Sequence, residues 1–131
     1  MTTRRSSQSA SPFETQFGYA RAVRVGNLIH VSGTAAIEPD GSVTPGGAGP
    51  QTERCLAIIA SALAELDSTL ADVVRTRIFI TDIRQYPAVG EAHHAAFADV
   101  RPAATMVEVS ALIHPDMIVE IEADAVIDAA D

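Results

Sequence analysis

Residues 118–127 read Ile-Val-Glu-Ile-Glu-Ala-Asp-Ala-Val-Ile, and this stretch decides the fold. Its residues alternate with the period of two that places neighbouring side chains on opposite faces of a β-sheet. One face is uniformly apolar and carries Val119, Ile121, Ala123, Ala125 and Ile127. The other mixes three carboxylates with apolar residues: Ile118, Glu120, Glu122, Asp124 and Val126. The first face needs an apolar cover, and the second is neither a normal core face nor a normal solvated one.

Two helices are predicted to supply that cover. Within residues 52–66, apolar side chains recur at spacings of three and four, which is the pattern of an amphipathic helix. A second, alanine-rich helix is expected over Ala88–Phe97, after Tyr86-Pro87, because proline is tolerated in a first helical turn. Between them Val73–Thr81 alternates and is rich in β-branched residues, which predicts a central strand. Its helix-facing side chains should be Val74, Thr76, Ile78 and Ile80.

Further strands complete the predicted sheet. Gly26-Asn27 lies between two alternating runs and predicts a hairpin turn, whereas the glycine-rich stretch 45–50 is expected to form an irregular loop. Two more strands are predicted over Ala104–Ser110 and Ile118–Ile127. The order of elements predicts an α+β fold: a two-layer sandwich with a mixed sheet of five to six strands and two helices on one face.

Length and composition indicate one soluble domain. The chain has 131 residues, of which 47% are hydrophobic, and no apolar run approaches the roughly 18 residues of a membrane span. Residues 1–16 are small and polar and are expected to be a flexible segment before a single domain at 17–128. No secretory signal is recognised, so the expected location is the cytoplasm. No membrane partner is predicted.

The charged residues exclude several kinds of chemistry. The chain has 17 acidic residues, nine arginines and no lysine, giving a net charge of −8. A lysine Schiff base and a P-loop lysine are excluded, and nucleic-acid binding is disfavoured because it depends on clustered positive charge. The single Cys55 excludes an internal disulfide, and His93-His94 lack the spacing of a helical metal motif. We therefore expect no metal site.

Four strings resemble the Rid family, also called the YjgF family of reactive-intermediate deaminases, in order and spacing. They are Val25–Gly33, Val74–Asp82, Arg101–Val109 and Val119–Val126. The resemblance covers roughly residues 17–127. It implies a chorismate-mutase-like fold assembled as a homotrimer, with the sheets packed inward and a small-molecule cleft at each subunit boundary. Such packing would account for the mixed face of residues 118–126; the alternative is a solvated face with weak ion pairs to Arg75 and Arg77.

The resemblance also implies an activity. Members hydrolyse enamine or imine forms of amino acids to a 2-oxo acid and ammonia, without a cofactor. In them a tyrosine closes the pocket, a glutamate positions water and an arginine grips the substrate carboxylate. The matching residues here are Tyr19, the Ser32-Gly33 pair and Glu120.

The arginine does not match. The family's Pro-Ala-Arg-Ser appears here at residues 102–105 with Ala104 in place of the arginine, so the substrate-binding segment becomes Ala104, Thr105 and Met106. An asparagine common on the second helix is replaced by Gly90. Because a guanidinium holds a carboxylate by two charge-assisted hydrogen bonds, its loss should weaken the binding of a small anionic imine by two orders of magnitude or more. Arg101 is close in sequence; Arg24, Arg75 and Arg77 are other possible substitutes.

Two functional hypotheses follow. In the first, the chain is a Rid-type hydrolase with altered substrate preference, and Glu120 activates water. In the second, it is a non-catalytic trimer of the same fold that binds a small molecule or acts as a chaperone-like subunit. The residues leave two further alternatives open. Glu120 is either a catalytic group or an ion-pair partner of Arg75 or Arg77, and Tyr19 either closes the pocket or is an edge aromatic.

Overall fold

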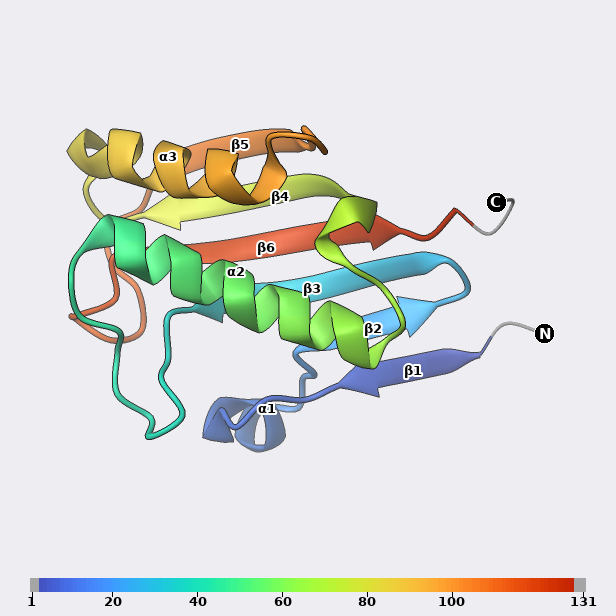
Figure 1. Cartoon of the computed structure of the whole chain (residues 1–131). Coiled ribbons are helices and arrows are strands. Elements are labelled where there is room, and N and C mark those ends of the chain that lie inside the picture. Colours follow the sequence, from blue (N-terminus) through green and yellow to red (C-terminus); the bar gives the residue numbers. More distant parts are fainter. Residues whose placement is uncertain (1–2, 129–131) are drawn as a thin grey trace.

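Six strands form one sheet in the computed structural model, which describes residues 3–128 (Figure 1). The order across the sheet is β1-β2-β3-β6-β4-β5. Strands β4 and β5 are parallel, and all other neighbours are antiparallel, so the predicted mixed sheet is confirmed. The strand bounds are Arg4–Ser7 (β1), Ala22–Val25 (β2), Leu28–Ala35 (β3), Val73–Ile80 (β4), Ala103–Glu108 (β5) and Val119–Val126 (β6).

Two helices cover one face of this sheet, as predicted. Helix α2 (Ala48–Glu65) packs on β3 and β6, and α3 (Tyr86–Phe97) lies beside α2 over the β4–β5 edge (Figure 1). A short helix α1 (Pro12–Phe17) and two 3-10 turns, Leu70–Asp72 and Ile83–Gln85, complete the element list. In the part of the chain that the structure describes, no helix has the length and hydropathy needed to cross a membrane.

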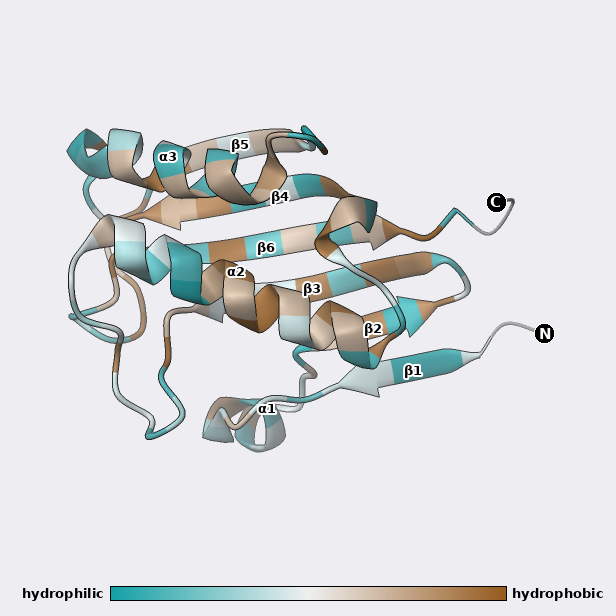
Figure 2. Cartoon of the chain, in the orientation of Figure 1, coloured by the Kyte–Doolittle hydropathy of each residue, from teal (hydrophilic) through white to brown (hydrophobic). Residues whose placement is uncertain are grey.

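Strand β6 lies between β3 and β4 and behaves as its sequence predicts. Its apolar side chains Val119, Ile121, Ala123 and Ala125 are buried under the helices, whereas the alternating acidic ones are half-buried on the other face. Figure 2 shows this alternation of hydrophobic and hydrophilic residues along the strand. The last strand in sequence therefore lies in the middle of the sheet, which brings Glu120 to its uncovered face.

Strand β4 departs from the predicted alternation at its start. Val74, expected under the helices, is 48% exposed, and Val73 is buried in its place. The register with β6 shifts between Val73 and Arg75, so a bulge adds one residue and reverses the facing of everything before it. Thr76, Ile78 and Ile80 remain on the covered face as expected.

The segment expected to be flexible, residues 1–16, is instead part of the fold from Arg4 onward. Strand β1 pairs with β2 along its whole length, and helix α1 follows. Side chains anchor both: Arg5 donates to Asp67 at 2.8 Å, and the hydroxyl of Ser7 donates to the carboxylate of Glu65. Composition alone did not reveal this, because the polar side chains of the segment find partners that are distant in sequence.

The other correction concerns the loop expected at residues 45–50. Helix α2 begins at Ala48, so Ala48, Gly49 and Pro50 form its first turn. Proline is compatible with this position because the first amide groups of a helix have no intrahelical acceptor. The predicted turn at Gly26-Asn27 does join β2 and β3, and Gly26 has the positive φ of 61° that such a turn requires.

Candidate functional site

Strand β3 is interrupted by a bulge at the Ser32-Gly33 pair. Its register against β6 shifts between Val31 and Thr34, so the two intervening residues stand out of the regular ladder. The hydroxyl of Ser32 donates to the carbonyl of Ala20 at 2.7 Å, and its amide donates to the carbonyl of Arg21 at 2.9 Å. The bulge is therefore tied to the segment that carries Tyr19.

Glu120 lies directly against this bulge. A β-carbon placed on Gly33 would come within 2.9 Å of Oε1 of Glu120 and 3.1 Å of its carboxyl carbon. Glycine at position 33 thus leaves the space that the carboxylate occupies. On β6, Glu120 pairs in register with Ala35 of β3 and Phe79 of β4, neither of which offers it a charge.

The surroundings of Glu120 favour its protonated form. Burial raises the pKa of this carboxyl above its ordinary value, the positive charge of Arg21 opposes the rise, and the negative charge of Glu122 adds to it. Among residues 3–128, Glu120 makes no ion pair: Arg77, one of its two possible partners, binds Asp124 at 3.1 Å and Glu122 at 3.7 Å instead. A half-buried carboxylate without an ion-pair partner and with a raised pKa is suited to general acid/base chemistry near neutral pH.

Arg21 is a central residue of the site that sequence reasoning missed. Its side chain is only 6% exposed, and its Nη1 donates to the carbonyl of Gly33 at 2.6 Å and to the hydroxyl of Thr34 at 3.1 Å. Its Nε donates to Glu14 at 3.1 Å. The guanidinium therefore holds the bulge and neutralises a buried carboxylate. The only signal in the sequence was an arginine between Ala20 and Ala22, in a stretch that also contains Arg24.

Glu14 completes this buried network. Burial tends to raise the pKa of its carboxyl, but hydrogen bonds from Ser9 and Arg21 outweigh that effect and lower the pKa below its ordinary value. The amide of Ser9 donates to Oε1 at 2.8 Å, and the hydroxyl of Ser9 bonds to Oε2. Residues before the predicted domain boundary thus support the site through Arg21.

Tyr19 lies at the surface beside this cluster. It is 38% exposed, and the guanidinium carbon of Arg21 stands 5.6 Å from the centre of its ring. An exposed ring fixed over a buried cation is compatible both with closing a pocket and with an edge position. The structure thus gathers Tyr19, Ser32 and Gly33 around the bulge, with Glu120 against it.

The predicted substrate-binding segment is elsewhere in the chain. Ala104, Thr105 and Met106 lie on β5 at the sheet edge, with β4 between them and β6. Ala104 pairs with Thr76 and so faces the helix layer, opposite to the face of Glu120. Met106 also faces the helices and packs on the core, and Thr105 lies exposed opposite Arg77. One chain therefore does not bring the two halves of the predicted cleft together.

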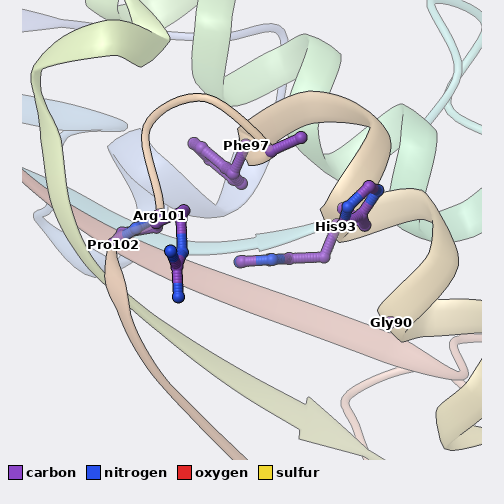
Figure 3. Close-up of a pocket in the computed structure, with 7 residues that line it drawn as sticks. Gly90, His93, Phe97, Arg101 and Pro102 are labelled. Carbon is purple, nitrogen blue, oxygen red and sulfur yellow. The ribbon is translucent and has the colours of Figure 1, made fainter.

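A pocket of about 500 Å³ lies on the helix side next to this segment (Figure 3). It lies at the C-terminal half of α3 and the loop that leads into β5. Its lining consists of Gly90, His93, His94, Phe97, Ala98, Arg101 and Pro102. The ring of His93 packs 4.7 Å from that of Phe97, and its Nε2 lies 2.9 Å from the hydroxyl of Thr76. Burial lowers the pKa of His93, which favours a neutral imidazole.

The histidines and the cysteine considered in the sequence analysis do not form a metal site or a reactive thiol within residues 3–128. No group of three or more histidine, cysteine or acidic side chains there is arranged to hold a metal ion. Cys55 of α2 is buried in the hydrophobic core, and burial raises the pKa of its thiol to about 12. A thiol with this pKa is an unreactive core group at neutral pH.

Comparisons with known proteins identify relatives of this chain. Residues 9–127 match the family described as Endoribonuclease L-PSP. The crystal structure of Rv2704 from Mycobacterium tuberculosis, described as a member of the YjgF/YER057c/UK114 family, has a TM-score of 0.88 and 46% identity, covering 95% of this chain and 100% of that one.

Two curated proteins are also similar. The uncharacterised protein SCO2049 of Streptomyces coelicolor is 36% identical over 95% of this chain and 92% of its own length. The 3-aminoacrylate deaminase RutC of Acinetobacter baylyi is 33% identical over 79% of this chain and 82% of its own length. The similarity thus extends from a protein without a described activity to one named as a deaminase.

Proposed function

The chain belongs to the Endoribonuclease L-PSP family, also called YjgF or Rid, and from this we propose that it hydrolyses an imine or enamine to a carbonyl product and ammonia. The family includes enamine and imine deaminases, RutC among them. The observation that carries the proposal is Glu120: a half-buried carboxylate with a raised pKa, free of ion pairs within residues 3–128 and seated against a glycine bulge.

The reaction uses Glu120 as the group that moves protons. An enamine first gains a proton on carbon and loses one from nitrogen, and so becomes an imine. Glu120 then takes a proton from water as the water oxygen bonds to the imine carbon, and it passes this proton to the nitrogen to give a carbinolamine. In the final step the carbinol oxygen loses its proton to Glu120 and becomes a carbonyl, and Glu120 gives a proton to the nitrogen as the carbon–nitrogen bond breaks and ammonia leaves. Imine plus water thus gives carbonyl plus ammonia, with the carboxylate regenerated.

A complete cleft requires a second copy of the chain. The half around Glu120 lies on the uncovered face of the inner strand β6, and the half around Ala104 lies on the covered face of the edge strand β5. The uncovered face also exposes apolar side chains, among them Val74 and Val107. We therefore propose a homotrimer with the substrate bound between subunits, which light scattering tests: the mass of a single 13.8 kDa chain would exclude it.

Ala104 favours a second candidate function. Without a guanidinium at this position, a trimer of the same fold would bind a neutral small molecule without turnover. By contrast, the net charge of −8 argues against the nuclease activity in the family's description, because binding to phosphates depends on clustered positive charge.

The deciding experiment measures ammonia release from imines generated in place by an amino-acid oxidase. The panel should span side chains from alanine to phenylalanine. Wild type should exceed the uncatalysed rate for at least one imine, and Glu120→Gln should reduce that excess by about 10²–10⁴-fold. The matched control is Glu122→Gln, which removes a carboxylate two residues away on the same face. If wild type never exceeds the uncatalysed rate, or if both variants lose activity equally, the proposal that Glu120 catalyses imine hydrolysis is wrong.

A further inference from the structure

The pocket beside α3 is open at a position without a side chain. Gly90 lines it, and a β-carbon added there would meet no atom within 4 Å. Ala104 carries only a methyl group, on the same covered face of the sheet, opposite Thr76, to which His93 is bonded. The volume of about 500 Å³ is in the range of small-ligand sites. This pocket therefore has room for more than a three-carbon substrate.

Arg101 stands on the opposite side of the pocket from α3 (Figure 3). Its backbone has a φ of 53°, in the left-handed region that favours glycine, and its amide donates to the carbonyl of Phe97 at 2.8 Å to close the turn after the helix. The guanidinium makes no hydrogen bond or ion pair with any residue that the structure describes. The fold would therefore be more stable with glycine at position 101, and no contact of the arginine side chain offsets the backbone strain.

The other groups of the pocket complement a guanidinium. Ala98 and the ring of Pro102 supply apolar surface, and the imidazole of His93, whose Nε2 is bonded to Thr76, has one ring nitrogen left to bond a ligand. A planar guanidinium binds a carboxylate through two parallel hydrogen bonds, a geometry that no other side chain provides. A ligand with a carboxylate at one end and a large apolar group at the other would use both kinds of surface.

We propose that this pocket is the recognition site for 2-imino and 2-oxo carboxylates with large apolar side chains, and that Arg101 binds their carboxylate in place of the residue missing at position 104. The apolar side chain of the ligand occupies the space left by Gly90. This inference rests on the proposed hydrolysis for its biological meaning, but it concerns binding, which can be measured without turnover.

The test is calorimetric titration of the full chain with stable 2-oxo acids. Wild type should bind 2-oxo-4-phenylbutanoate at least tenfold more tightly than pyruvate, and more tightly than 4-phenyl-2-butanone, which lacks the carboxylate. Arg101→Ala should weaken the binding of the oxo acid at least tenfold, and Arg101→Lys less. Arg84→Ala is the control, because it removes the same charge from an exposed site before α3, where Arg84 pairs with Asp82.

Arg101→Gly separates recognition from folding. Because glycine is preferred at this φ, the variant should lose binding while its melting temperature stays the same or rises. Gly90→Leu should fill the pocket, abolish the preference for the larger oxo acid and leave pyruvate binding unchanged. Each variant is checked for unchanged mass by light scattering.

The outcomes distinguish this inference from the proposed function. Equal binding by wild type and Arg101→Ala, or no binding of any 2-oxo acid by wild type, overturns the inference even if ammonia is released. Binding that depends on Arg101 but is not accompanied by ammonia release supports recognition in this pocket and overturns the proposed hydrolase activity. Glu120→Gln should lose turnover and keep the Arg101-dependent binding.

Discussion

The carboxylate of Glu120 on β6 fills the space where a side chain at position 33 of β3 would begin, with its Oε1 2.9 Å from the place of a β-carbon on Gly33. The two residues are 87 positions apart in sequence and meet because β3 and β6 are neighbours. The φ of Gly33 is not positive, so glycine here meets a need for space rather than for backbone freedom. The position of the carboxylate thus depends on the absence of one methyl group.

Gly33→Ala should reduce activity more than stability. The new methyl group displaces the flexible end of Glu120, so we expect a loss of about 10–100-fold in kcat/KM and about 1 kcal/mol or less in unfolding free energy. Steady-state ammonia release and thermal unfolding measure the two quantities. Adding Glu120→Asp, which shortens the side chain, should recover part of the stability. A loss of stability without a loss of activity would show that the carboxylate need not be at this place.

Glu120→Gln should raise stability at neutral pH. The folded-state pKa of Glu120 is above its ordinary value, so folding favours the protonated form, and stability is lost as pH rises through the folded pKa. A neutral glutamine removes that loss and should raise the melting temperature at pH 7. Below pH 4 the gain should vanish. A gain that is independent of pH would contradict this account of the carboxyl.

The pH profile of turnover should show the same raised pKa. A general base acts only when deprotonated, so kcat/KM should fall as pH decreases, with a midpoint above the ordinary 4.5 of a glutamate. Arg21 lowers this pKa by its charge, so Arg21→Gln should move the midpoint to higher pH. The measurement is ammonia release from pH 4 to 8, on folded protein. A midpoint at or below pH 4.5 would mean that the fall of kcat/KM in acid comes from the titration of another group.

Arg21→Met should destabilise the chain by about 3–5 kcal/mol, because it leaves the carboxylate of Glu14 buried without its partner. The pKa of Glu14 is lowered in the folded state, so the stability that it contributes is present at neutral pH and is lost as pH falls through the folded pKa. The cost of the variant should therefore shrink in acid. The double variant Glu14→Gln/Arg21→Met is the control and should recover more than half of it. Chemical denaturation at pH 7 and pH 4 provides the comparison.

Arg101→Gly should stabilise the chain by about 1 kcal/mol, or about 3–5 °C, because a left-handed φ of 53° is costly for any residue with a β-carbon. Arg101→Ala keeps that cost and should leave the melting temperature unchanged. A destabilised glycine variant would mean that the arginine side chain supports the fold.

Local periodicity determined much of the architecture in advance. The alternation of residues 118–127 identified which face of β6 the helices cover, and the helical spacing in residues 52–66 located most of α2. It was wrong where irregular geometry breaks the period, as at Val74, where one bulged residue reverses the facing of the strand start. Composition was wrong for residues 4–16, whose polar side chains gain order only from partners such as Asp67 and Glu65.

The candidate site shows the same division. Resemblance to a family pointed to Tyr19, Ser32, Gly33 and Glu120, and the last three belong to strings that can be read along the chain. Arg21 and Arg101 could not be assigned in this way. The role of Arg21 depends on Glu14 and on the carbonyl of Gly33, which come together only in three dimensions.

By itself the sequence determined the two-layer fold, because that fold follows from patterns between near neighbours. Resemblance to a family pointed to Glu120 as the acid for the proposed reaction. Only the tertiary structure decided that Glu120 has no ion-pair partner within residues 3–128 and that Ala104 faces away from it. The burial of a side chain, the charges around it and the sheet face on which it lies depend on residues that are distant along the chain. Strand order and bulges determine which residues these are.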